Sequence, residues 1–213
     1  MTDLTTDSSG PLLRPAALSD IESLSRLLVQ LYAYEVPGML RGEFTVQTEV
    51  ARRLLSSAPL GRRYVLVRDG QVVAMGCLAT QTAPRPATPP GVLLAFPSIM
   101  GVRDALRSYA GVLRGLLTVT APPAADDGQI HSVVVDADAR GEGAGTVLME
   151  HLENQAALSG KDRATLQVLT SNSTARAFYR ARGYAEVGPA HGRLRTALAF
   201  PSMLMHKDIG PEL

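Results

Sequence analysis

One stretch of the sequence constrains the fold most, because it joins a strand pattern to a helix pattern through a glycine-rich turn. Residues 130–135 (IHSVVV) form a run rich in β-branched side chains, which is typical of a strand. The turn DADARGEGAG follows, and Val147, Leu148 and Leu152 then recur at helical spacing before Gly160 offers a natural end. The turn is therefore expected at the N-terminus of a helix.

This turn has the chemistry of an anion-binding site. Its three glycines (141, 143 and 145) leave backbone N–H groups open to a ligand where the positive end of the helix dipole lies. Arg140 adds a guanidinium that can make paired hydrogen bonds to phosphate oxygens, so a pyrophosphate is the expected ligand. A P-loop is excluded because the turn holds no lysine, and the dinucleotide motif GxGxxG fails because Thr146 replaces its third glycine.

A second motif follows, one helix and one strand later. Residues 164–169 (ATLQVL) are predicted to form a strand, which leads into the segment SNSTARAFYRARGY. Together the two segments resemble the GNAT superfamily of N-acetyltransferases, and the resemblance covers residues 130–207 closely. The pattern Arg/Gln-x-x-Gly-x-Gly/Ala is matched by Arg140, Gly143 and Gly145. The pattern Asn-x-x-Ala-x-x-Phe-Tyr-x-x-x-Gly-Phe/Tyr is matched by Asn172, Ala175, Phe178, Tyr179, Gly183 and Tyr184.

The resemblance implies an α/β (α+β) domain of the GNAT fold, a mixed twisted sheet of about six to seven strands flanked by helices. It implies that the strand with Val133 to Val135 splays away from the strand with Gln167 to Leu169, and that acetyl-CoA lies in the opening. Backbone groups of the first strand would pair with the pantetheine arm as another strand would. Asn172 can cap the next helix or donate to the pantetheine chain. The implied cofactor-binding residues are Val133, Val134, Val135, Arg140, Gly141, Glu142, Gly143, Ala144, Gly145, Thr146, Asn172, Ala175, Phe178 and Tyr179.

Tyr179 is the expected catalytic acid. A phenol of pKa about 10 can protonate the leaving CoA thiolate, whose pKa is about 8.5. The acceptor ammonium must lose a proton before its nitrogen attacks the thioester through a tetrahedral intermediate, and the two central strands hold no glutamate to take it. His131 is the candidate catalytic base, directly or through a water. Glu35, Asp126 and Asp127 remain open as alternatives.

The upstream half follows the usual element order of the family without diagnostic residues. A strand is predicted at residues 12–16, helices at residues 21–31 and 46–55, and a β-hairpin at residues 64–75 with the Asp69-Gly70 pair in its turn. Residues 81–128 are interpreted as an insertion that lids the acceptor site, makes a dimer contact or extends the core. Its helix is predicted to carry an apolar face of Ile99, Val102, Leu106, Tyr109, Leu113 and Leu116.

The composition fits one enzyme domain of the cytoplasm. The 213 residues are 46% hydrophobic and 19% charged, so one domain over residues 1–213 is expected, with residues 1–11 as a flexible tail. The N-terminal stretch lacks a secretory pattern, no run is long enough to span a bilayer, and Cys77 has no second cysteine to pair with. A net charge of +1 with dispersed basic residues predicts neither nucleic-acid nor membrane binding. The four histidines lack metal-ligand spacing, so no metal is expected.

The function expected from the sequence is acetyl transfer from acetyl-CoA to a primary amine of a small molecule that the sequence does not identify. Two alternatives remain open. The acceptor could be a protein N-terminus or lysine, which would favour an open acidic groove. The chain could also be a non-catalytic acyl-CoA-binding regulatory module, which the missing strand glutamate favours and Tyr179 opposes. Whether the chain forms a homodimer is open too.

Overall fold

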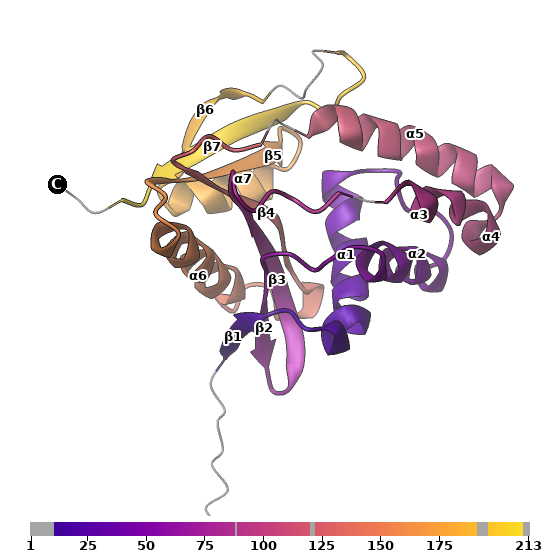
Figure 1. The fold of residues 1–213 in the computed structure, drawn as a ribbon, viewed down its shortest axis with the longest axis horizontal. Helices are drawn as coiled ribbons and strands as arrows, with labels where there is room; N and C mark the ends of the chain where they lie inside the picture. The colour runs from indigo at the N-terminus through magenta and orange to yellow at the C-terminus, as the bar shows by residue number, and fades with distance from the viewer. Residues whose placement is uncertain (1–10, 88, 120–121, 191–195, 211–213) are drawn as a thin grey trace, which may run out of the picture.

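The sheet is the frame on which the other elements are arranged. The computed structural model describes residues 11–87, 89–119, 122–190 and 196–210, so most of the expected tail lies outside the described residues. Within these ranges seven strands form one sheet in the order β1-β2-β3-β4-β5-β7-β6, in which β4 and β5 are parallel and the other neighbours antiparallel (Figure 1). This mixed sheet confirms the predicted fold class. The strands are β1 (Leu12–Pro15), β2 (Arg63–Arg68), β3 (Gln71–Ala79), β4 (Asp127–Val135), β5 (Arg163–Leu169), β6 (Ala185–Pro189) and β7 (Ser202–Asp208).

The hairpin between β2 and β3 confirms the turn prediction. Arg68 and Gln71 face each other across the turn, and the two residues between them, Asp69 and Gly70, have φ values of 50° and 73°. Positive φ at both central positions is the geometry whose twist matches that of paired strands, and Asp-Gly adopts it at low cost. The turn therefore fixes the register of the first half of the sheet.

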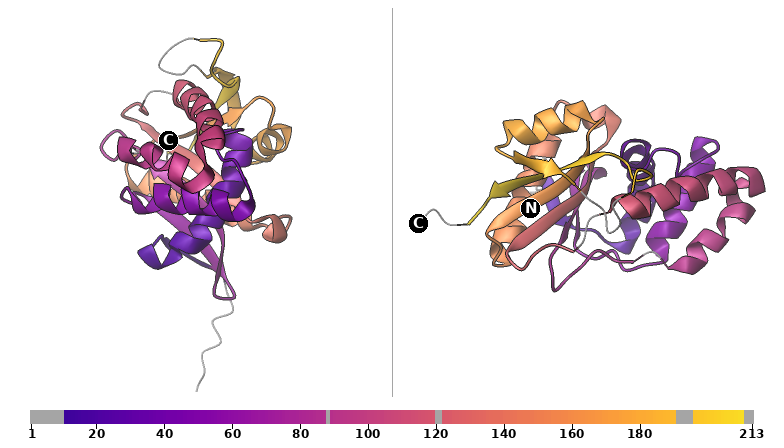
Figure 2. Two further views of the ribbon diagram at one scale, coloured as in Figure 1. Left: turned by 90° about the vertical axis from the view of Figure 1, so that its right-hand side faces the viewer. Right: turned by 90° about the horizontal axis from the view of Figure 1, so that it is seen from above.

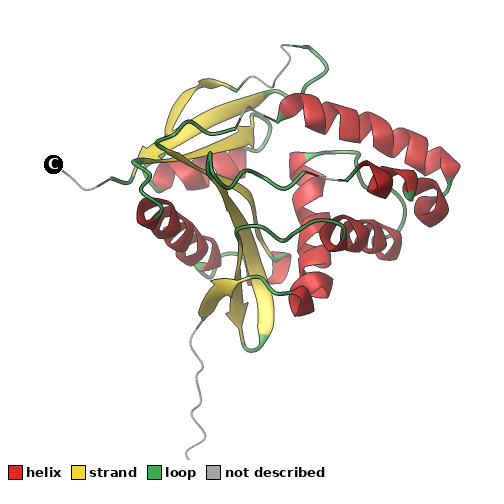
Figure 3. Cartoon of the chain, viewed as in Figure 1, coloured by secondary structure: helices red, strands yellow, loops and turns green. Residues whose placement is uncertain are grey.

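Helices cover both faces of the sheet (Figure 3). On one face lie α6 (Ala144–Leu158) and the side chains of α7 (Ser173–Ala181) that pack with it. On the other lies α1 (Ile21–Glu35), preceded by the short helix η1 (Leu18–Asp20). The fully buried Leu148 and Leu152 of α6 and Leu24 of α1 each contribute roughly 1.5–3 kcal/mol by leaving water. These two cores hold β3 and β4 rigidly between them.

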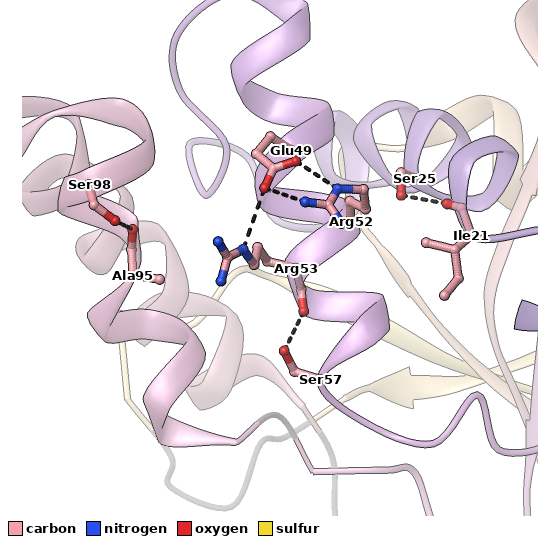
Figure 4. Close-up of polar contacts among 8 residues, drawn as sticks. All are labelled: Ile21, Ser25, Glu49, Arg52, Arg53, Ser57, Ala95 and Ser98. Atoms are coloured by element: carbon pink, nitrogen blue, oxygen red, sulfur yellow. Dashed lines mark hydrogen bonds and ion pairs between the residues drawn. The ribbon is translucent and has the colours of Figure 1, made fainter.

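The second helix, α2 (Phe44–Ser56), packs on α1 and keeps a polar outer side. There the carboxylate of Glu49 accepts hydrogen bonds from Arg52 at 2.7 Å and from Arg53 at 3.4 Å (Figure 4). All three side chains are partly exposed, so these pairs contribute little beyond local helix support. The helix is thus anchored by its apolar side.

Residues 90–118 add three helices that pack on the apolar side of α2, where Val50 and Leu54 lie. They are α3 (Pro90–Leu94), α4 (Phe96–Met100) and α5 (Val102–Thr118) (Figure 2). They share a third core with α2, centred on the fully buried Phe96 and on Val50. Part of the interpreted insertion therefore extends the core away from the sheet.

Most of the predicted apolar face of α5 does not extend the core. Four of its side chains are exposed, with exposed fractions of 66% for Val102, 64% for Leu106, 53% for Leu113 and 63% for Leu116. The buried face is made of small residues instead: Ala105, Ser108, Gly111 and Thr118. A Cβ on Gly111 would lie 2.7 Å from the backbone of Gly38 and Met39, so the small face lets the helix lie directly on that segment. Backbone contact, not side-chain burial, determines which side of α5 faces inward.

Candidate active site

The site lies where β4 and β5 separate. The two strands are paired from Asp127 and Arg163 as far as Ile130 and Leu166, and no pair follows in the described register. Ser132 has a φ of 53° and lies where the register between β3 and β4 shifts, so β4 bends at this point. The opening is continuous with a cavity of about 730 Å³ that reaches from α1 and α5 to α6 and α7. This is the splay that the family resemblance implied.

The glycine-rich turn forms one end of this cavity. It follows β4 and the short helix η2 (Ala137–Ala139), and Gly141 and Gly143 have φ values of 82° and 81°, which favour glycine. Helix α6 begins at Ala144, and its first intrahelical N–H bond runs from Val147 to the carbonyl of Gly143. The amides at the start of α6 therefore face the cavity without helical partners, where the helix dipole is positive.

Arg140 lies at the mouth of the cavity. Its Nε donates to the carbonyl of Val135 at 3.1 Å, and its Nη2 lies 3.4 Å from Oε1 of Gln30 on α1. The guanidinium also lies 5.9 Å from the ring centroid of Tyr34. These contacts hold the side chain across the end of β4, where its remaining N–H groups can reach an anion.

Glu142 is the cofactor-binding candidate that the structure does not bring to the cavity. Its side chain is exposed and forms an ion pair with Arg68 at the end of β2. It is absent from the cavity wall, whereas Val133, Val134, Val135 and the other turn residues of the prediction line it. The chain turns Glu142 outward because its position alternates with the inward-facing glycines.

Helix α7 forms the wall opposite the turn. Asn172 accepts a hydrogen bond from the Ala175 N–H at 3.1 Å through its Oδ1, so it caps the helix. It also lines the cavity, and its amide group has no other hydrogen bond in the described part of the chain, which leaves two N–H donors for a ligand. The two proposed tasks of Asn172 are therefore compatible.

Phe178 packs close to the turn, where a Cβ on Gly145 would lie 3.4 Å from its ring.

Tyr179 lies at the centre of the cavity wall. It is 9% exposed, and its ring packs edge-on against Phe178 and Tyr184. Burial raises the pKa of its phenol above the usual range, and the nearby carboxylate of Glu35 raises it further. The raised pKa keeps the hydroxyl protonated. The hydroxyl makes no hydrogen bond with any described residue, so it is available as a donor.

Two further titratable groups, Glu35 and His131, line the same cavity as Tyr179. Burial raises the pKa of Glu35, at the end of α1, to about 7, although Arg85 opposes part of that shift. Burial and the charges of Arg85 and Arg63 lower the pKa of His131 well below its usual value, so His131 is neutral at pH 7. A carboxylate with a pKa near the working pH is the better proton acceptor of the two.

The other two base alternatives lie elsewhere. Asp126 precedes β4 and Asp127 begins it, at the end where β4 and β5 are still paired. Neither lines the cavity, and the carboxylate of Asp127 is taken by Arg163 at 2.9 Å.

Several wall residues had no signal in the sequence. Arg85 comes from the proline-rich connector after β3, and Gly115, Thr118 and Val119 come from the end of α5. Gln167 of β5 donates to the carbonyl of Thr118 at 2.8 Å, which ties α5 to the splayed strand. These residues are far apart in the sequence, and no local pattern indicates that they lie together in the folded chain.

The cavity fits acetyl-CoA in the chemistry of its lining. Free amides and a guanidinium lie at one end for phosphates, an unpaired strand edge lies along the middle, and titratable groups lie at the far end. Most of the hydrogen-bonding groups belong to the backbone. They can therefore bind an extended arm that contains amides whatever the identity of the neighbouring side chains. A splayed sheet with this lining has the groups that a CoA thioester would need.

Comparison with known proteins identifies the family. The acetyltransferase (GNAT) family profile matches residues 33–184, and the chain belongs to that family and is an acyltransferase. No curated protein sequence matches the chain significantly.

Solved structures share the fold at low identity. An acetyltransferase structure is 21% identical with a TM-score of 0.58, and the alignment covers 93% of this chain and 99% of that one. A GCN5-related N-acetyltransferase from Kribbella flavida is 16% identical with a TM-score of 0.53, over 93% and 97% of the two chains. A ribosomal-protein-alanine N-acetyltransferase from Brucella melitensis is also 16% identical with a TM-score of 0.53, over 92% and 99%. These likenesses support the fold and leave the acceptor open.

The described residues include neither a candidate membrane span nor a candidate metal cluster. None of the helices there is both long and apolar enough to cross a membrane. In the same residues, no three side chains of His, Cys, Asp or Glu gather in a way that could hold a metal ion.

Proposed function

We propose that this acyltransferase moves the acetyl group of acetyl-CoA to a primary amine of a small molecule. The observation that carries the proposal is one continuous cavity with an anion-binding helix terminus at one end and Glu35 with Tyr179 at the other. Acetyl-CoA bound there would supply a thioester carbonyl for an amine to attack. The chain's own residues would hold the phosphates, align the arm and move two protons.

Backbone groups, with Arg140 and Asn172, would bind and align acetyl-CoA. The amides of Gly141, Gly143 and the first turn of α6, with the Arg140 guanidinium, would hold the pyrophosphate. The edge of β4 that β5 leaves unpaired at Val133 would pair with the pantetheine amides in the manner of an added strand, while the carbonyl of Val135 keeps its bond from Arg140. Asn172 would donate from its free amide nitrogen while its oxygen keeps the helix cap.

Two side chains of the cavity wall, Glu35 and Tyr179, would transfer the protons. Glu35, with a pKa of about 7, would take the proton from the incoming ammonium, directly or through a water. Tyr179, protonated throughout the physiological range, would donate to the departing sulfur as the carbon–sulfur bond breaks. His131 would stay neutral and contribute a hydrogen bond at the acceptor end.

A small acceptor fits this lining better than a protein chain. Protein acetylation favours an open acidic groove, whereas the acceptor end here holds one carboxylate, Glu35, beside the guanidinium of Arg85 and under the end of α5. The proposal includes a cytoplasmic location, which the single, buried Cys77 supports because the chain holds no disulfide partner for it.

The test is thiol release from acetyl-CoA over a panel of primary amines, with mass spectrometry to find an increase of one acetyl group in the amine. The proposal expects release that depends on both the protein and the amine. Binding of acetyl-CoA without release from any amine, and without acetylation of added proteins, would instead favour the regulatory module. Acetylation of protein substrates alone would move the acceptor to the protein class.

A further inference from the structure

The acceptor end of the cavity holds two opposite charges that lack partners. Glu35 reaches it from the C-terminus of α1, and Arg85 reaches it from the connector between β3 and α3. In the described part of the chain neither side chain forms a hydrogen bond or an ion pair, even with the other. The Nε of Arg85 is buried and has no acceptor. A buried N–H donor without an acceptor is costly, so this guanidinium is suited to an anionic ligand.

The surroundings make this end of the cavity cationic. Arg63 of β2 donates its Nε to the sulfur of Cys77 at 3.3 Å, and its Nη1 is likewise buried without an acceptor. His131 is neutral there, because burial and both guanidinium groups lower its pKa. Arg85 in the cavity wall and Arg63 outside it, which both act on His131, therefore place two positive charges near the one carboxylate of this end, Glu35. A simple alkylammonium would meet a net positive charge, whereas an amine with its own anionic group would neutralise it.

The anion that Arg85 can bind is not a phosphate of CoA. Arg85 acts electrostatically on His131, and the connector leaves β3 at Ala79, opposite Gln129 on β4. The phosphate-binding turn begins beyond Val135, at the other end of the same strand. Four residues of strand from His131 to Val135 span about 13 Å, a separation that the pantetheine arm has to cover.

We propose that the acceptor is a small primary amine that also carries a carboxylate or a phosphate-type anion, with the anion bound by Arg85 and the amine facing Glu35. This inference rests on the proposed acetyl transfer to an amine. Arg85 presents a planar set of donors that matches a carboxylate or a phosphate in two parallel hydrogen bonds. Arg85 would thus select the acceptor, and Glu35 would activate it.

The experiment compares amines that differ in one anionic group. The pairs are γ-aminobutyrate with butylamine and alanine with ethylamine, and aminopropylphosphonate tests the phosphate-type anion. The measured quantity is kcat/KM for thiol release at saturating acetyl-CoA. The inference expects wild-type kcat/KM to be at least about 10-fold higher for the anionic member, and the carboxylate and phosphonate arms identify which anion is preferred.

Two substitutions locate the preference at Arg85. Arg85→Gln should raise KM for anionic acceptors and lower the ratio of kcat/KM between the anionic and the neutral member of each pair about 10- to 100-fold; the ratio is the readout because Arg85 also lowers the pKa of Glu35. Arg85→Lys should restore part of the loss, because it keeps the charge but not the paired geometry. The matched control is Arg62→Gln, since Arg62 donates to Ser159 at 2.8 Å and does not line the cavity. Unchanged acetyl-CoA affinity in all three variants shows that the fold is intact.

A binding measurement tests the same contact without turnover. The product N-acetyl-γ-aminobutyrate should bind to the CoA-loaded protein more tightly than N-butylacetamide, and Arg85→Gln should remove the difference.

The outcomes separate this inference from the proposed function. Equal kcat/KM within each pair, or a preference that Arg85→Gln leaves intact, overturns the inference while acetyl transfer stands. If the wild-type protein acetylates no amine in any pair and neither product binds, the proposed function falls and the inference falls with it.

Discussion

Ile130 on β4 and Leu166 on β5 are the last two residues that face each other before the central strands separate. Both are buried in the core beneath α6, so the strands are fixed up to this pair and free beyond it. The cavity begins where the pairing stops, and Val133 and Gln167 line it from its two sides. The binding site therefore results from an interruption of the sheet, and the predictions below test the groups around that interruption.

Tyr179→Phe should lower kcat about 10²- to 10³-fold, because it removes one proton donor and leaves the ring in place. Acetyl-CoA affinity should change by less than about 2-fold, since the phosphates and the pantetheine arm contact other groups. The measurement is steady-state thiol release together with a titration of acetyl-CoA. The control is Tyr109→Phe, whose hydroxyl donates to the Leu93 carbonyl at 2.7 Å away from the cavity. Equal turnover in Tyr179→Phe and wild type would reject the donor assignment.

Gly143→Ala should weaken acetyl-CoA binding. Gly143 has a φ of 81° at the N-terminus of α6, and a side chain there strains the backbone by about 1–2 kcal/mol and shifts the amides that face the phosphates. Gly160→Ala is a matched control, because Gly160 has a φ of 70° at the other end of α6 and, like Gly143, has open space at its Cβ. Both variants should lose similar thermal stability, and only Gly143→Ala should lose affinity. Equal affinity in the two would mean that the turn does not bind the phosphates.

Glu35→Gln should change the pH dependence of activity. In the wild type, kcat/KM should rise as Glu35 loses its proton at about pH 7, whereas the variant should lack this limb and keep only the slow rise from the amine itself. Glu22→Gln, on the exposed side of the same helix, should behave as the wild type does. If His131→Asn removes the limb and Glu35→Gln keeps it, the base is His131 instead.

The same substitution should change stability with pH in a defined direction. Glu35 has a folded pKa of about 7 against an unfolded value of 4.5, so the folded state binds more protons between these values. Wild-type stability therefore falls as pH rises through this window, and the cost is complete above pH 7. Relative to wild type, Glu35→Gln should gain roughly 3 kcal/mol of unfolding free energy between pH 4.5 and 8. Urea unfolding at both pH values measures this, and parallel behaviour of variant and wild type would show that Glu35 is not buried as described.

The parts of the fold that local chemistry determines could be predicted from the sequence. The Asp69-Gly70 turn needs positive φ at two adjacent residues, and few other pairs allow it. The turn before α6 is similar, because its glycines and the helix that follows determine its shape together. The candidate cofactor-binding residues from Val133 to Tyr179 all line the cavity except Glu142, which pairs with Arg68 outside it.

Features that depend on distant neighbours could not be predicted in the same way. The inner side of α5 is set by the backbone of Gly38 and Met39, which lies more than 70 residues earlier, so its leucine pattern could not show that the small residues face inward. Strand β6 (Ala185–Pro189) is short and largely exposed and exists through its pairing with β7. Arg85 reaches the cavity because the connector folds back from β3 toward β4, and its sequence neighbours are prolines that indicate only an extended chain. Each of these features requires the assembled sheet.

The most direct test of the central claim is calorimetric titration of the protein with acetyl-CoA. The cavity at the splay between β4 and β5 predicts one site per chain with a micromolar dissociation constant, competition by CoA, and clear weakening in Gly143→Ala. No heat of binding from acetyl-CoA or CoA with the folded protein would contradict the assignment of this cavity.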